Sequence, residues 1–201
     1  MKRGALVLCG GRSRRMGLDK ATLPFGGETL LQRVVRRLAP VVGETVVVAG
    51  PDQALPPLPA GVRVARDDVP EQGPLAGIAA GLAVATADAL YATGCDVPFL
   101  CPAVARRLFD RLEGHDAAVL VQDGFVHPLA AVYRRAVRPA AVRLLAAGRP
   151  RPLHLLEEVD ALHVPTDEIL DLDPALETLE NLNTPEAYEA ALARLRRETP
   201  S

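Results

Sequence analysis

Short apolar runs rich in valine, leucine and alanine alternate along this chain with longer segments of helical periodicity. Such alternation is typical of βαβ units, in which helices join parallel strands. The expected strands are Ala5–Cys9, Thr45–Ala49, Val62–Ala65, Ala89–Thr93, Ala117–Val121, Ala130–Tyr133 and Leu162–Val164. The expected helices are Leu30–Leu38, Leu75–Ala85, Ala103–Leu112, Arg135–Ala146 and Pro185–Arg197. The sequence therefore predicts the α/β class with a mainly parallel sheet.

The length of the chain favours one domain that spans residues 1–201. With 201 residues, of which 49% are hydrophobic, the chain can bury one good core but not two ordinary ones. The segment Pro51–Gly61 is rich in proline, yet strand-like runs flank it closely on both sides, so we interpret it as a surface loop. The range Leu153–Asp173 has no clear periodicity.

Charge and cysteine usage narrow the class of protein. The 23 Lys and Arg residues nearly balance the 25 Asp and Glu residues, so no general basic field points to nucleic acid. The apolar runs are too short to span a bilayer, which predicts a soluble protein without a membrane partner. Cys9, Cys95 and Cys101 lack metal-site or redox-motif spacing, and no signal peptide is evident. We therefore expect a cytoplasmic protein whose cysteines are small buried residues.

The first expected strand runs into the stretch LVLCGGRSRRMGLDK, residues Leu6–Lys20. Glycines after the first strand of an open sheet let backbone N–H groups approach an anion closely. The basic residues that follow add positive charge where a polyphosphate would lie. The residues concerned are Gly10, Gly11, Arg12, Arg14, Arg15 and Lys20. The stretch lacks the spacing of a P-loop and of a dinucleotide fingerprint, and a glycine turn with solvated arginines is the alternative.

A second candidate is Asp96, in the stretch TGCDVPFL at the end of an expected strand. A carboxylate at the carboxyl end of a central strand can hold a Mg²⁺ ion that bridges phosphate oxygens. The alternative is a cap for the following helix. Because Pro102 fits the first turn of that helix better than Pro98, Asp96 falls outside the cap, and we favour the metal role.

The stretch ARDDVPEQGPLAGIAAGL, residues Ala65–Leu82, places Asp67 and Asp68 after a strand and starts a helix at Gly73-Pro74. The small residues of this helix permit close packing against the sheet or against a flat ligand. With Asp67 beyond a neighbouring strand, the segment could form one wall of a nucleotide pocket.

Two weaker candidates lie further along the chain. His127-Pro128 precedes an expected strand, and a simple turn is the more probable role for it. Asn181 and Asn183 lie in the stretch ENLNTPEAY. One possibility is that they end one segment and help to cap the last helix. The other is that the chain is extended here, so that both side chains point to the same side and recognise a substrate. The residues themselves leave these alternatives open.

The opening stretch resembles the signature loop of nucleotidyltransferases with a Rossmann-like fold. Together with GPLAG, CDVPFL, HP and NLNTPE in this order, the sequence closely resembles the molybdenum cofactor guanylyltransferase family over nearly its whole length. The resemblance implies a three-layer sandwich with helices on both faces. It also implies transfer of GMP from Mg-GTP to the terminal phosphate of molybdenum-molybdopterin, with release of pyrophosphate. Implied further partners are molybdenum-insertion proteins and apo-molybdoenzymes.

The resemblance also assigns roles to individual residues. Leu8, Cys9, Gly10 and Gly11 would line the GTP site, and Arg15 and Lys20 would hold phosphates. Asp67 would contact the nucleotide, Asp96 would bind both Mg²⁺ and nucleotide, and Asn181 and Asn183 match a pair near the cofactor-substrate pocket. Some members of the family carry an asparagine after the second strand. This chain reads VVVAGPD there, so Ala49-Gly50 provides no side-chain amide.

The mechanism expected for such a site needs positive charge and in-line geometry more than a covalent nucleophile, because two anionic phosphates must meet. Two other functions stay open at this point. One is a nucleotidyltransferase that uses CTP or a sugar phosphate. The other is a non-catalytic protein that only binds the cofactor.

Overall fold

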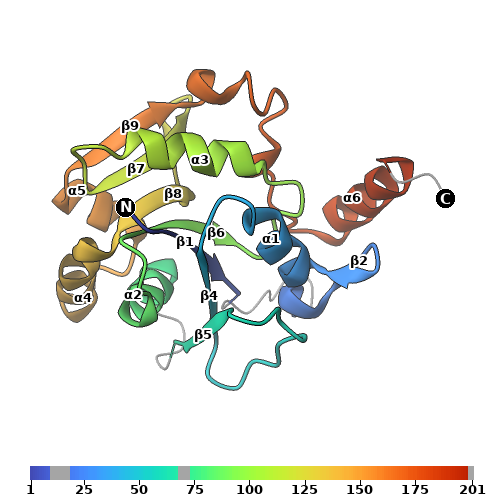
Figure 1. The fold of residues 1–201 in the computed structure, drawn as a ribbon, viewed down its shortest axis with the longest axis horizontal. Helices are drawn as coiled ribbons and strands as arrows, with labels where there is room; N and C mark the ends of the chain where they lie inside the picture. The colour runs from blue at the N-terminus through green and yellow to red at the C-terminus, as the bar shows by residue number, and fades with distance from the viewer. Residues whose placement is uncertain (10–18, 68–72, 199–201) are drawn as a thin grey trace.

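The computed structural model describes residues 1–9, 19–67 and 73–198, which form a seven-stranded sheet between two layers of helices (Figure 1). In this part of the chain the strands are β1 (Arg3–Leu8), β2 (Pro24–Phe25), β3 (Glu28–Thr29), β4 (Glu44–Ala49), β5 (Arg63–Arg66), β6 (Ala89–Gly94), β7 (Ala117–Gln122), β8 (Phe125–Arg134) and β9 (Ala161–Pro165). The α-helices are α1 (Leu30–Leu38), α2 (Pro74–Val84), α3 (Pro102–Arg111), α4 (Arg138–Ala146), α5 (Pro152–Glu158) and α6 (Pro185–Glu198). Four 3₁₀ turns join them: η1 (Lys20–Thr22), η2 (Arg135–Val137), η3 (Thr166–Ile169) and η4 (Glu177–Leu179).

The main sheet has the order β5-β4-β1-β6-β8-β7-β9 and is mostly parallel. Strand β1 pairs in parallel with β4 and β6, and β7 pairs in parallel with β9. Strand β8 is antiparallel to both of its neighbours, β6 and β7. The β7–β8 hairpin turns at Asp123-Gly124, both with positive φ, as a two-residue turn of matching twist requires. The predicted α/β class with a mainly parallel sheet is confirmed.

Each face of the sheet carries its own hydrophobic cluster, because successive side chains of a strand point to opposite faces. Val7 and its alternate neighbours pack against α1 and α3, whereas Leu6 and Leu8 pack on the face that carries α2, α4 and α5. Full burial of one such aliphatic side chain contributes about 1.5–3 kcal/mol. Figure 1 shows α2 and α4 on one side of the sheet and α1 and α3 on the other.

Helix α2 lies unusually close to β1. A Cβ atom at Gly77 would come within 2.9 Å of Leu8, and one at Gly81 would overlap Leu6. Gly73, with φ +75°, precedes the helix, and Pro74 opens it. Of the two roles predicted for these small residues, the structure shows close packing against the sheet.

A third hydrophobic cluster joins the β2–β3 hairpin to the C-terminal helix α6. Phe25 of β2 packs there with Leu195 of α6 and with Phe99 and Leu182. The hydroxyl of Tyr188 donates a hydrogen bond to the carbonyl of Pro24. In Figure 1, α6 extends away from the sheet beside β2, so this cluster fixes its position.

Some predicted boundaries were wrong. His127-Pro128 lies inside β8, where the register with β7 shifts between Val119 and Leu120, and it does not precede a strand. Helix α5, Pro152–Glu158, begins one residue before the range that showed no clear periodicity and lies otherwise within it. The segment predicted as one helix from Arg135 begins with the η2 turn before α4. Pro51–Gly61 is a loop between β4 and β5, as predicted.

Within the described ranges, no helix is both long enough and apolar enough to cross a membrane.

Candidate active site

The candidate site lies at the carboxyl ends of β1 and β6. These adjacent parallel strands end in register, with Leu8 opposite Gly94, and the Cys95 N–H donates to the Leu8 carbonyl at 3.1 Å. After β1 the chain goes to β4 on one side and reaches β6 on the other side only later. Open α/β sheets bind ligands at such a switch point. Cys9 and Asp96 therefore follow adjacent strands at the same edge of the sheet, where folds of this kind have their binding crevice.

Lys20, Asp96 and Asn183 meet at this edge of the sheet. The Lys20 Nζ donates to Asp96 Oδ2 at 2.7 Å and to Asn183 Oδ1 at 2.8 Å. The Lys20 and Asp96 side chains are only 15% and 16% exposed. Lys20 and Asp96, which were predicted to share one site, thus form one polar cluster with Asn183, which was predicted as a possible contact of the second substrate.

Neighbouring backbone positions the Asp96 main chain and leaves space for its carboxylate. The Asp96 carbonyl accepts a hydrogen bond from the Leu182 N–H at 2.9 Å, which ties the β6 end to the C-terminal segment. A Cβ atom at Gly94 would overlap Asp96 Oδ1, so the carboxylate occupies space that only glycine leaves open. The N-cap of α3 is Cys101, so Asp96 does not cap that helix, as predicted.

We expect Gly94→Ala to lower turnover and to raise the Mg²⁺ concentration that half-saturates the enzyme. The added methyl group would displace the flexible carboxylate while the strand itself persists. Gly43→Ala is the matched control, because the nearest atom to its new Cβ is a carbonyl oxygen 3.9 Å away. Steady-state rates against Mg²⁺ concentration and melting temperatures measure both effects. Equal Mg²⁺ dependence in the two variants would contradict the assignment of Asp96.

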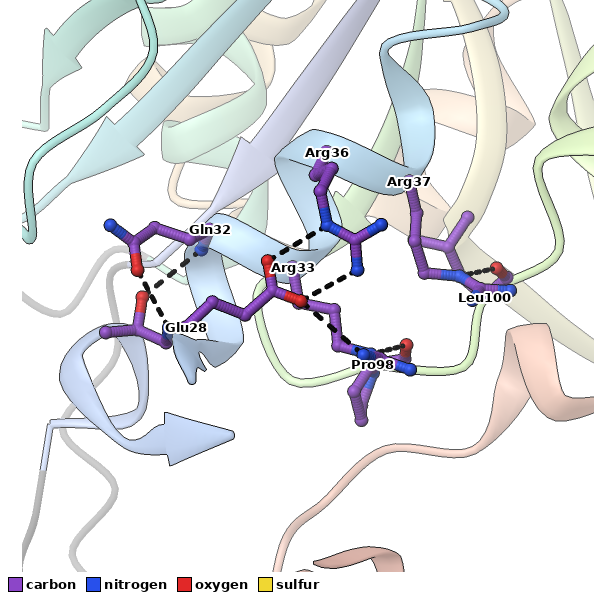
Figure 2. Close-up of polar contacts among 8 residues, drawn as sticks. Glu28, Gln32, Arg33, Arg36, Arg37, Pro98 and Leu100 are labelled. Carbon is purple, nitrogen blue, oxygen red and sulfur yellow. Dashed lines mark hydrogen bonds and ion pairs between the residues drawn. The ribbon is translucent and has the colours of Figure 1, made fainter. Parts of the chain in front are cut away.

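Arginines of α1 hold the loop that follows Asp96 (Figure 2). The Arg33 Nε donates to the Pro98 carbonyl at 2.9 Å, and the Arg37 Nε donates to the Leu100 carbonyl at 2.7 Å. Arg33 is only 7% exposed. Figure 2 shows both side chains reaching from one helix to the loop residues Pro98 and Leu100.

A carboxylate and two aromatic rings compensate the buried charge of Arg33. Its Nη1 lies 3.5 Å from Glu28 Oε1, and its guanidinium lies 5.1 Å from the Phe25 ring centre and 5.6 Å from that of Phe99. Hydrogen bonds from Arg36 lower the pKa of Glu28, so this carboxylate carries its charge at neutral pH.

Gln53 is a site residue that the sequence analysis missed. Its Nε2 donates to the Cys9 carbonyl at 3.1 Å and to Asp19 Oδ1 at 2.8 Å, and its Oε1 accepts from the Gly50 N–H at 3.0 Å. The loop after β4 therefore does carry an amide, three positions beyond Gly50. No local pattern distinguishes this glutamine in a proline-rich loop, so only the fold reveals it.

The cysteines at this edge of the sheet are buried side chains. Cys9 and Cys95 are both buried, and all three cysteines are free. A hydrogen bond with Cys95 and burial raise the pKa of the Cys9 thiol, which keeps it protonated at neutral pH. Burial of Cys9 and Cys95 was predicted, whereas Cys101 is partly exposed.

The other predicted residues fall into two groups. Asp67 follows β5, and its N–H donates to the Ala49 carbonyl at 2.9 Å, two strands away from β1. Leu8 packs its side chain against α2, so only its backbone faces the crevice edge. The remaining predicted residues lie outside the described ranges: Gly10, Gly11, Arg12, Arg14, Arg15 and Asp68.

Thr184, and neither asparagine, caps α6. Its Oγ1 accepts a hydrogen bond from the Ala187 N–H at 3.2 Å. Of the two roles left open for Asn181 and Asn183, the structure therefore does not show the capping of this helix. Both asparagines are exposed on the extended segment before it, on either side of the buried Leu182.

Comparisons with known proteins show the family to which this chain belongs. The family model of the MobA-like NTP transferase domain matches residues 5–162. The chain belongs to the MobA-like NTP transferase domain family. A relative from Mycobacterium avium, named probable molybdenum cofactor guanylyltransferase, is 39% identical over 98% of both chains.

Solved structures show the same MobA-like fold. Molybdopterin-guanine dinucleotide biosynthesis protein A from Archaeoglobus fulgidus superposes with a TM-score of 0.80 at 24% identity, over 98% of this chain and 100% of that one. A protein from Mycobacterium tuberculosis in complex with manganese has a TM-score of 0.65 at 19% identity, over 96% of this chain and 99% of that one. These similarities extend beyond the residues of the family match to the C-terminal segment that carries Asn183.

Proposed function

We propose that this protein transfers GMP from Mg-GTP to the phosphate of molybdenum-molybdopterin, giving the guanine dinucleotide cofactor and pyrophosphate. The observation that carries the proposal is the convergence of Lys20, Asp96 and Asn183 at the carboxyl ends of β1 and β6. The names of the relatives supply the identity of the substrates. The crevice supplies a cation and a carboxylate, as transfer between two phosphates requires.

The residues present fit a Mg²⁺ ion bound together with GTP. Mg²⁺ prefers oxygen ligands and is usually held by one or two carboxylates plus substrate phosphates. Asp96 offers such oxygens, and within the described ranges no three histidine, cysteine or acidic side chains gather into a protein-only metal site. When bound there, Mg²⁺ would neutralise charge on the phosphates.

Positive charge from the protein would complete the electrostatics. Lys20 is one of only two lysines in the sequence, and it lies beside the proposed metal ligand. Arg15, Gly10 and Gly11 are proposed to contact phosphates, and Asp67 the nucleotide. The attacking group is the substrate's own phosphate, which with a second pKa of about 6 is largely ionised at neutral pH. The chain therefore needs no general base, and the protonated Cys9 cannot serve as a nucleophile.

Further assignments follow from this proposal. Leu8 and Cys9 would present backbone groups to GTP, and Asn181 would contact the molybdopterin. Molybdenum-insertion proteins and apo-molybdoenzymes are the proposed partners, and the cytoplasm is the proposed compartment. The near balance of charges favours small-molecule substrates over nucleic acid.

Nucleotide preference and product release together test the proposal. We expect GTP with Mg²⁺ to raise the melting temperature more than CTP, ATP or UTP, because a specific ligand stabilises the folded state by mass action. We also expect pyrophosphate release from GTP only when molybdenum-molybdopterin is present. Preference for CTP would indicate a cytidylyltransferase. Cofactor binding without pyrophosphate release would indicate a carrier protein.

A further inference from the structure

The two asparagines of the C-terminal segment have different surroundings. Leu182 between them is 1% exposed and packs with Phe25 and Leu195, which fixes the segment against the β2–β3 hairpin and α6. Asn183 Oδ1 accepts the hydrogen bond from Lys20 Nζ at 2.8 Å. The Asn181 side chain makes no hydrogen bond within the part of the chain that the structure describes. The two amides therefore cannot be treated as one matched pair.

Asn183 limits the freedom of a lysine that would otherwise pair with Asp96 alone. A lysine ammonium is a flexible point charge with three donors. Here one donor goes to Asp96 Oδ2 at 2.7 Å and another goes to Asn183, which leaves the third available to a phosphate oxygen. Fixing such a side chain in advance lowers the entropy that ligand binding must otherwise remove.

We propose that Asn183 is a positioning residue for Lys20, and that the C-terminal segment thereby forms part of the GTP triphosphate site. Asn181 lacks this contact and therefore has no such positioning role. The inference rests on the proposed function in one respect, namely that Lys20 contacts GTP phosphates. Because the Leu182 N–H also binds the Asp96 carbonyl, a ligand that moves this segment alters the metal ligand and the lysine together. The affinities of the two substrates should then be coupled reciprocally.

A double-mutant cycle on GTP affinity tests this role. Mg-GTP binding is measured by calorimetry without any second substrate, in the parent protein and in Asn183→Ala, Asn181→Ala, Lys20→Ala and the double variant Lys20→Ala with Asn183→Ala. We expect Asn183→Ala to weaken binding about tenfold, as for a lost hydrogen bond to a charged group. We expect Asn181→Ala to change binding less than twofold. In the Lys20→Ala background, Asn183→Ala should have no further effect.

Either of two results overturns the proposal: unchanged GTP affinity in Asn183→Ala, or an equal loss in the presence and absence of Lys20. Melting temperatures of all variants show whether each is folded. A purely structural role for Asn183 would lower the melting temperature without coupling to Lys20.

A second measurement does not depend on GTP at all. Lys2 and Lys20 are the two lysines of the chain, so acylation by a small anhydride can be followed at each by peptide mass spectrometry. We expect Asn183→Ala to increase the acylation rate of Lys20 relative to Lys2, and Asn181→Ala to leave this ratio unchanged. If no nucleotide binds but the ratio rises, the proposed function fails and the positioning contact stands. An unchanged ratio in Asn183→Ala overturns the contact itself.

Discussion

Replacing Asp96 with alanine is expected to reduce turnover at least about a thousandfold, the size of effect seen when one electrostatic contact to a phosphoryl-transfer transition state is lost. Its carboxylate is the proposed metal ligand, and Lys20 is its ion-pair partner at 2.7 Å. The fold should persist, because the hydrogen bond from Leu182 goes to the backbone carbonyl of Asp96. Pyrophosphate release under saturating substrates, with melting temperature as the check on folding, measures the effect.

Asp96→Asn is the matched variant, because it keeps the size of the side chain and removes its charge. We expect this variant also to lose most activity, and raised Mg²⁺ to restore part of it. Near-normal rates in either folded variant at ordinary Mg²⁺ concentration would show that the metal lies elsewhere.

Replacing Lys20 with alanine is expected to lower kcat/KM for GTP by about 100- to 1,000-fold. The change removes the ammonium proposed to neutralise phosphate charge, so both GTP affinity and the rate of transfer should fall. Steady-state kinetics at varied GTP, together with binding of Mg-GTP, separates the two contributions.

Lys2→Ala provides the control for this result. Lys2 is exposed at the start of β1, at the opposite edge of the sheet, where its N–H donates to Asp88 at 2.7 Å. Its removal changes the net charge by the same amount, so general electrostatic effects appear equally in both variants. Similar values of kcat/KM in Lys2→Ala and Lys20→Ala would show that Lys20 has no specific role.

Local patterns predicted most of the helices and strands in this fold. Helix α1 was placed at its observed bounds, because a leucine and valine stripe of period 3.6 follows Thr29, whose hydroxyl accepts from Gln32 N–H in a capping box. The antiparallel direction of β8 was not predicted, although Asp123-Gly124 is a strong hairpin signal between two apolar runs. The Gly26-Gly27 turn of the β2–β3 hairpin was also overlooked, because its strands are only two residues each.

Lys20 and Asp96 were predicted to share one site, but the contact between Asn183 and Lys20 was not predicted. Lys20 and Asp96 stand after strands at positions where the carboxyl edge of a parallel sheet gathers side chains. The hydrogen bond between Lys20 and Asn183 joins residues 163 positions apart, and no periodicity encodes such a contact. The packing of Leu182 decides which of the two neighbouring asparagines reaches the lysine.

Arg33 and Arg37 of α1, which bind the loop after Asp96, affect how easily this loop unfolds locally. The acceptors on Pro98 and Leu100 are bound by a helix 63 to 65 residues earlier in the chain. Opening of this loop therefore has to break hydrogen bonds to α1 as well as contacts within the loop. Because these contacts hold the loop in place, its amide hydrogens should exchange with solvent more slowly than those of an ordinary surface loop.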